Sequence, residues 1–191
     1  MGYVMSFSLP TGETCNTMAP CWTSGKCYAH RMELRHPSVK KSWAKNLSLL
    51  RSDDNWGDTF VKDTIKAIHL KKPELFRWHV GGDIFAPWYL DNMCLIAKKC
   101  PDVSFWTFTK QFDILENYES AIPDNLNIIL SVWPPCIPSV KLMKRFGCCY
   151  FQDKSGTFIV PNNAFECEGD CEMCTKCATL GPGQSVVIIE H

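Results

Sequence analysis

Residues 75–99 read LFRWHVGGDIFAPWYLDNMCLIAKK, and this stretch decides the fold. The run LFRWHV is typical of a buried strand, and Gly81, Gly82 and Asp83 end it. Pro87 then opens a segment whose apolar residues have helical spacing. A strand, a short loop and a helix in this order form the repeating unit of a parallel sheet covered by helices.

The same unit recurs along the chain. Further strand-like runs lie at residues 3–9, 103–108, 127–132, 148–151 and 186–189, with a hairpin arm expected at 157–160. Helical spacing marks residues 34–50, 59–70, 111–121 and 139–145. The 191 residues, 46% of them hydrophobic, suffice for one substantial core. We predict a single α/β domain over residues 1–191, a reduced or partial (βα) barrel of about six mostly parallel strands with helices outside.

Polar or reactive residues follow the first three predicted strands. The first strand runs into a cysteine-rich loop, the second into Gly81, Gly82 and Asp83, and the third into Lys110. In a parallel sheet such loops meet at the carboxyl edge, where ligands bind. Asp83 and Lys110 are therefore candidates for contact with a ligand, or for catalysis. The alternatives are that Asp83 caps the helix before Pro87 and that Lys110 is solvated.

Seven of the twelve cysteines form two tight groups. The C-terminal group, C-x3-C-x2-C-x2-C, lets several thiolates converge on one ion or cluster from a single loop. Uncoordinated thiolates this close would repel or oxidise, so we predict a bound iron–sulfur cluster, with zinc as the alternative. The members of this group are Cys167, Cys171, Cys174 and Cys177.

The N-terminal group reads C-x5-C-x5-C and consists of Cys15, Cys21 and Cys27. Three thiolates without a local fourth leave one metal position open for water or substrate, whereas four thiolates close a site. The alternatives are that this loop only turns, with packed thiols, or that both groups ligate one shared cluster. The sequence thus predicts a closed, structural or electron-transfer site in the C-terminal group and a site with an open metal position in the N-terminal group, unless the two groups share one site.

The order of these motifs resembles the radical S-adenosylmethionine enzymes. The resemblance rests on a strand leading into three cysteines that end in Cys27-Tyr28-Ala29, followed by Gly81-Gly82-Asp83 on the next strand. Residues 5–120 also resemble small cysteine-rich bacteriophage proteins of unassigned activity, in SLPTGETC, CYA, HVGGDIF and FWTFTK. The usual spacing in the radical enzymes is C-x3-C-x2-C, which here occurs only in the C-terminal group.

The resemblance to the radical enzymes implies two cofactors, an iron–sulfur cluster and S-adenosylmethionine. The ligands of a [4Fe-4S] cluster would be Cys15, Cys21 and Cys27, and its open iron would bind S-adenosylmethionine. Gly81, Gly82 and Asp83 would face the methionine amino group. Radical catalysis is one expectation, and its rivals are an electron-transfer or redox-sensing protein with a saturated cluster and a zinc-stapled binding module.

The other cysteines and His79 are expected to be packing residues. Free cysteine in an apolar segment behaves as a small core residue, and a histidine inside a strand is more often a hydrogen-bonded core residue than a ligand. The five scattered cysteines are Cys94, Cys100, Cys136, Cys148 and Cys149.

Charge and the N-terminal sequence bear on partners and location. Twenty basic and twenty acidic residues create no global field that would gather nucleic acid, so the expected partner is a small-molecule ligand or a redox protein. The N-terminus lacks the basic start and apolar core of a signal peptide, and no window approaches the ~18 apolar residues of a spanning helix. We expect no membrane contact and a cytoplasmic location, the host cytoplasm if the protein is viral. In that reducing compartment, clustered cysteines are metal ligands more often than disulfides.

Overall fold

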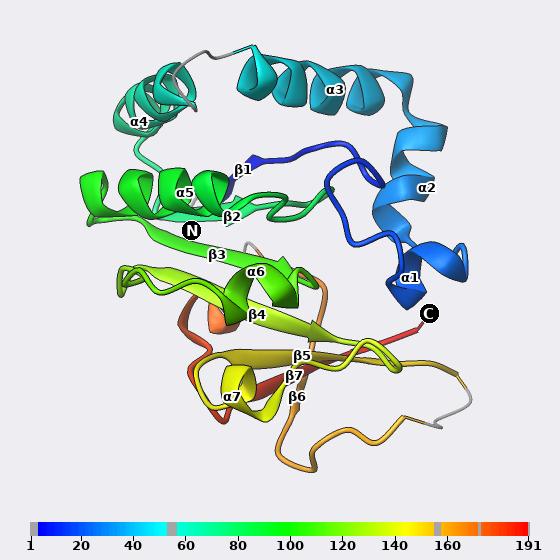
Figure 1. Cartoon of the computed structure of the whole chain (residues 1–191). Coiled ribbons are helices and arrows are strands. Elements are labelled where there is room, and N and C mark those ends of the chain that lie inside the picture. Colours follow the sequence, from blue (N-terminus) through cyan, green and yellow to red (C-terminus); the bar gives the residue numbers. More distant parts are fainter. Residues whose placement is uncertain (1–3, 53–56, 155–157, 172, 191) are drawn as a thin grey trace.

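A seven-stranded parallel sheet organises the chain (Figure 1). The computed structural model describes residues 4–52, 57–154, 158–171 and 173–190. The strand order is β1-β2-β3-β4-β5-β7-β6, and every neighbouring pair is parallel. This confirms the predicted α/β class and fits a partial barrel. The strands are β1 (Val4–Phe7), β2 (Leu75–Trp78), β3 (Ser104–Thr109), β4 (Leu126–Val132), β5 (Gly147–Gln152), β6 (Phe165–Glu166) and β7 (Ser185–Ile189).

Helices fill most of the connections between the strands. They are α1 (Pro20–Thr23), α2 (Tyr28–Arg35), α3 (Pro37–Arg51), α4 (Asp58–Lys71), α5 (Pro87–Lys99), α6 (Phe112–Glu116), α7 (Val140–Met143) and the 3-10 helix η1 (Lys176–Thr179). In the described part of the chain, no helix is long and apolar enough to cross a membrane.

Several local predictions differ from the structure. The helix predicted over residues 111–121 is only Phe112–Glu116, and the strand predicted over residues 75–80 ends at Trp78. The predicted helix over residues 34–50 is two helices that meet at His36, because the residue before Pro37 is disfavoured in the helical conformation. Residues 158–160 of the predicted hairpin arm form no strand, and residue 157 lies outside the described residues. The additional strand is β6, only two residues long and placed at the sheet edge beside β7.

Side chains alternate between the two faces of the sheet, as the period of a strand requires. Phe76, Trp78 and Phe105 point toward the helices and join the larger core with α4 and α5. Leu75 and Trp106, their neighbours in sequence, belong to a second apolar cluster. Both faces are therefore buried, which is usual for parallel sheets.

His79 lies in the larger core, as the sequence predicted. It is 4% exposed, and its ring nitrogens lie 3.0 Å from Thr107 Oγ1 and 3.0 Å from Tyr89 Oη. Burial lowers the pKa of His79 to about 3, so the imidazole is neutral at physiological pH.

The C-terminal segment covers the second face of the sheet. Phe165, Cys167, Cys171 and Cys177 pack against the second apolar cluster, and η1 lies against β3 and β4. Asn127 Nδ2 of β4 donates to the carbonyl of Cys177 at 2.6 Å, which fixes η1 on the sheet. The second cysteine group thus lies where a partial barrel has its interior.

Candidate functional site: two cysteine groups on one sheet

The N-terminal cysteine loop lies at the carboxyl edge of the sheet, as predicted. Leu9 N donates to the carbonyl of Gly81 at 2.9 Å, and Gln111 Nε2 donates to the carbonyl of Thr14 at 3.2 Å. The loop thereby contacts the segments that follow β2 and β3. At its far end, Lys26 Nζ lies 2.8 Å from Glu190 Oε1, just after β7. The loop therefore extends from β1 toward the opposite side of the sheet.

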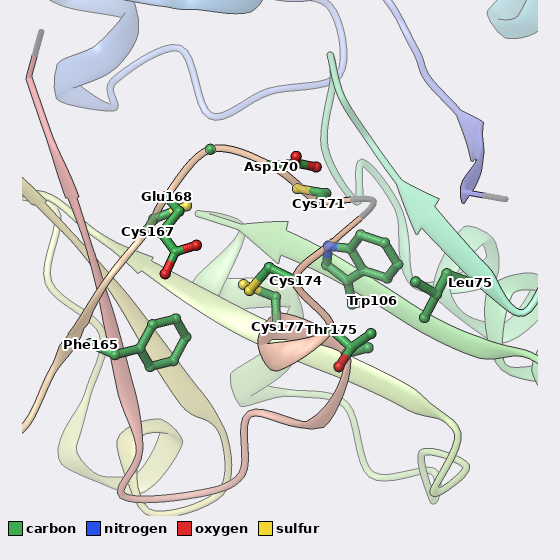
Figure 2. A pocket seen from close by; sticks show the side chains of 12 residues that line it. Leu75, Trp106, Phe165, Cys167, Glu168, Asp170, Cys171, Cys174, Thr175 and Cys177 are labelled. Carbon is green, nitrogen blue, oxygen red and sulfur yellow. The ribbon is translucent and has the colours of Figure 1, made fainter. Parts of the chain in front are cut away.

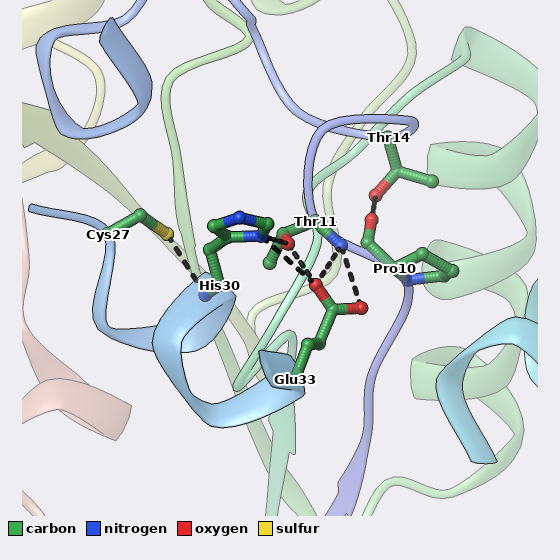
Figure 3. A network of polar contacts seen from close by, with 6 residues as sticks. All are labelled: Pro10, Thr11, Thr14, Cys27, His30 and Glu33. Carbon is green, nitrogen blue, oxygen red and sulfur yellow. Dashed lines mark hydrogen bonds and ion pairs between the residues drawn. The ribbon is translucent and has the colours of Figure 1, made fainter. Parts of the chain in front are cut away.

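A buried carboxylate holds the start of this loop against α2 (Figure 3). Glu33 is 7% exposed and accepts hydrogen bonds from the backbone N–H of Thr11, at 3.3 and 3.4 Å, and from its hydroxyl. His30 Nδ1 lies 3.2 Å from Thr11 Oγ1, and His30 N donates to Cys27 Sγ at 3.4 Å. Both ends of the cysteine loop are thus attached to the first turns of α2.

The three N-terminal thiols lie within electrostatic range of one another. Burial, together with the Asp83 carboxylate, Cys27 and Cys21, raises the pKa of Cys15 to about 12. Burial also raises the pKa of Cys21, while the Lys110 ammonium group opposes the increase. Cys15, Cys21, Cys27, Asp83 and Lys110 therefore lie in the same region of this edge, although, among the described residues, no three of the thiols and the carboxylate are arranged so that they could hold a metal ion as they stand.

The two glycines are explained by close packing of the loops. A Cβ on Gly81 would lie 2.1 Å from the Trp43 ring, and one on Gly82 would lie 2.6 Å from Leu9 Cβ and 2.7 Å from Thr14 Oγ1. Gly82 also has a φ of +85°, in the left-handed region that favours glycine. These contacts give both residues a structural role at the base of the cysteine loop.

Asp83 joins the ends of β2 and β3. Its Oδ1 accepts from Ile84 N at 2.7 Å and its Oδ2 accepts from Lys110 N at 2.9 Å. Burial raises the pKa of Asp83 to about 6, and these hydrogen bonds oppose the increase. The helix-cap alternative is wrong, because Ala86 is the N-cap of α5 and no side chain caps it.

Lys110 places an ammonium group beside these thiols. Its Nζ donates to Ser131 Oγ at 2.6 Å, and the residue is half-buried. The charge of Lys110 lowers the pKa of Cys21 and of Cys136, although burial raises both. Cys136, which the sequence classed with the packing residues, therefore lies close to the N-terminal group at the end of β4.

The four C-terminal cysteines line one cavity on the second face of the sheet (Figure 2). Its walls include Leu75 and Trp106 of the sheet and Phe165 beside the cysteine segment. Its volume is about 20 Å³, room for roughly one water molecule. The cavity is thus a small, largely apolar space onto which the predicted ligand set converges.

These thiols also influence one another. Burial, together with Cys167, Cys171 and Cys174, raises the pKa of Cys177 to about 12. In the described part of the chain, no three His, Cys, Asp or Glu side chains are arranged so that they could hold a metal ion as they stand. The C-terminal thiols therefore surround a space without closing on a single point.

Sequence reasoning missed two residues near this cavity. Arg77 Nη1 donates to Cys171 Sγ at 3.8 Å, and a charged residue inside the apolar run LFRWHV was the available signal. Cys149 of β5 is 3% exposed, and burial raises its pKa to about 12, with Lys110 and Cys177 among its charged neighbours. Nothing in the local sequence distinguishes this cysteine from Cys148, which belongs to the helix-covered core.

The fold and the site define a parallel α/β protein with two thiol-rich groups, one at the carboxyl edge of its sheet and one on the face away from the helices. The chain belongs to the family described as Gene product 88, which matches residues 2–133. It is similar to the Gene 88 protein of Mycobacterium phage L5, with 32% identity, and to the Gene 88 protein of Mycobacterium phage D29, with 31% identity, each over 151 residues. Each match covers 67% of this chain and 61% of the relative. No solved structure matches the chain.

The matched residues include the N-terminal cysteines, Asp83 and Lys110 and end before the C-terminal group. The family confirms the predicted relation to bacteriophage proteins. The resemblance to radical S-adenosylmethionine enzymes stays a prediction.

Proposed function

We propose that the protein binds a [4Fe-4S] cluster through Cys167, Cys171, Cys174 and Cys177. The observation that carries this proposal is the convergence of all four thiols on one cavity, supported by their mutual effect on the pKa of Cys177. Four thiolates are a complete ligand set for such a cluster, and an apolar shell with an N–H donor to a sulfur is a usual environment for one.

The spacing of the four thiols favours a cluster over zinc, because zinc usually joins two separated C-x2-C pairs, whereas this group packs four cysteines into eleven residues. The cavity of about 20 Å³ must widen to admit a cluster. Widening the cavity would have to displace described residues of the segment between β6 and η1, where Cys167 N donates to the carbonyl of Val187 at 2.8 Å and Cys171 packs against the second apolar cluster.

Anaerobic purification followed by iron, sulfide and zinc analysis tests the proposal. The expected preparation is brown, contains iron and sulfide in equal amounts, and loses its broad visible absorption on reduction. A colourless preparation with stoichiometric zinc and no sulfide would instead support the zinc-stapled module and contradict the cluster.

We propose a second, open centre at Cys15, Cys21 and Cys27. The supporting observation is that these thiols lie within electrostatic range of one another beside Lys110. A cluster with one free iron supplies a coordination position and one electron at low potential, the requirements for binding and cleaving S-adenosylmethionine. Because both Asp83 oxygens already accept backbone N–H groups, Lys110 is the better candidate for holding the carboxylate of such a ligand. Cys136 would saturate the centre if it served as a fourth ligand, giving an electron-transfer protein.

Titration of S-adenosylmethionine into the reduced protein distinguishes these two forms of the N-terminal centre. An open centre should show a changed electron paramagnetic resonance spectrum, and Lys110→Gln should weaken the binding without removing iron. Lys99→Gln, at the exposed end of α5, is the matched control and should bind as the wild type does. A spectrum that is unchanged at every ligand concentration would rule out the open centre and favour electron transfer.

A further inference from the structure

Arg77 lies between the two cysteine groups. Its Nη1 donates to Cys171 Sγ at 3.8 Å, and its Nη2 donates to Tyr28 Oη at 3.1 Å. Tyr28 directly follows Cys27, and its hydroxyl donates to the carbonyl of Val80 at 2.8 Å. One guanidinium group therefore contacts a thiol of the C-terminal group and the residue next to a thiol of the N-terminal group.

The guanidinium group has no carboxylate partner within the described residues. Its Nε atom is buried and lacks a hydrogen-bond partner, and its Cζ lies 5.6 Å from the centre of the Phe108 ring. A half-buried cation without an opposite charge is costly, because the interior solvates it poorly. Within the described residues, the guanidinium group therefore contacts a thiol, that of Cys171, rather than a carboxylate, although Glu168 and Asp170 also line the same cavity.

With a cluster bound, the C-terminal cysteine group would place negative charge beside this cation, because Arg77 Nη1 contacts the sulfur of one proposed ligand, Cys171, at 3.8 Å. A four-thiolate cluster is an anion in both oxidation states, and it becomes more negative on reduction. Positive charge and N–H donors beside the ligand sulfurs stabilise the reduced state more than the oxidised state.

We propose that Arg77 is a positioning residue that raises the reduction potential of the C-terminal cluster and, through Tyr28, couples this cluster to the N-terminal cysteine loop. This inference rests on the proposed iron–sulfur function. One rigid guanidinium group donates through Nη1 to Cys171 and through Nη2 to Tyr28. A change at one contact therefore alters the strength of the other. Coupling between two sites is reciprocal, so each centre affects the potential of the other.

An anaerobic redox titration, followed by electron paramagnetic resonance, measures the first part of the proposal. Arg77→Gln should shift the potential of the C-terminal cluster to a more negative value with its iron content retained. Arg77→Lys keeps the charge but loses the planar fork of donors, so its shift should have the same sign and be smaller. Arg145→Gln is the matched control. Arg145 is exposed, lies 5.0 Å over the ring of Phe146, a residue of the helix-covered core, and donates to the backbone carbonyl of Tyr118. The potential of this variant should equal that of the wild type.

Tyr28→Phe tests the coupling. This substitution removes one hydrogen-bond partner of Arg77. It should shift the potential of the C-terminal cluster when Arg77 is present and should not shift it in the Arg77→Gln background. A double-mutant cycle gives this result when two residues are coupled. Equal potentials in wild type, Arg77→Gln and Arg77→Lys, at full iron content, would overturn the role of Arg77. If Arg77→Gln does not bind iron, the proposal is tested by the reduction potential of the Arg77→Lys cluster. A potential equal to or above that of the wild-type cluster contradicts the proposal. Absence of iron and sulfide from the wild type is a different outcome, which refutes the iron–sulfur function itself.

Discussion

At the residue scale, Asp83 combines two opposing electrostatic effects. The carboxylate is 6% exposed, so burial penalises its charge, yet both of its oxygens accept backbone N–H groups. Burial prevails and raises its pKa from 3.8 to about 6. The ionised Asp83 carboxylate therefore destabilises the folded state, while its hydrogen bonds link the ends of β2 and β3 at the site.

A pH-dependent difference in stability follows from this shift. Between about pH 4 and pH 6 the folded state binds more protons at Asp83 than the unfolded state, so ionisation destabilises the fold as the pH rises. The destabilisation caused by Asp83→Asn should therefore shrink with rising pH, by up to about 3 kcal/mol. Chemical denaturation of both proteins at several pH values measures this, and His79 titrates in both, so its contribution cancels. A penalty that grows with pH would mean that the backbone hydrogen bonds prevail over burial.

At the element scale, the N-terminal cysteine loop depends on α2 for its position. The loop has little regular structure apart from the four residues of α1, so its contacts with α2 replace the constraints of a strand or a long helix. Glu33 and Thr11 supply the buried contact, while Glu13 and Arg51 form an exposed ion pair at 2.9 Å. The two acidic residues therefore offer a comparison of a buried and an exposed attachment of the same loop.

We expect Glu33→Gln to destabilise the protein by about 1–3 kcal/mol, because the amide cannot replace both acceptor oxygens of a buried carboxylate. The N-terminal centre should also lose iron preferentially, as its loop becomes less ordered. Glu13→Gln should change stability by less than about 1 kcal/mol, since both side chains of that pair are 58% exposed. Denaturant unfolding and iron analysis measure the two effects. Equal losses in the two variants would show that the Glu33 contact is not what positions the loop.

At the scale of the whole molecule, the C-terminal cysteine segment, which holds the proposed ligand set, is also a cover for the sheet. It packs on Leu75 and Trp106, residues that would otherwise face solvent from the second side of a parallel sheet. The proposed metal binding would therefore be linked to burial of this face, because the same segment would do both.

Cys174→Ser should remove iron and lower the melting temperature. A ligand present at 100 times its Kd stabilises the folded state by about 2.7 kcal/mol, and a loss of this order is expected. Chelation of iron from the wild type should lower its melting temperature at least as far as Cys174→Ser does, because it also empties the proposed N-terminal centre. Cys94→Ala alters a buried thiol on α5, so its iron content should remain that of the wild type. Equal iron loss in both variants would mean that the ligands have been assigned wrongly.

Local pattern alone determined the parallel α/β class, the carboxyl-edge position of the N-terminal loop and the two cysteine groups. Strand and helix periods are properties of neighbouring residues, and parallel strands end at a common edge. Only the tertiary structure decided that the C-terminal segment folds onto the second face of the sheet and that Arg77 meets Cys171, 94 residues away in sequence. It also assigned the glycines to packing against Trp43, Leu9 and Thr14. Such contacts depend on the path of the whole chain, and for that reason no local period of the sequence specifies them.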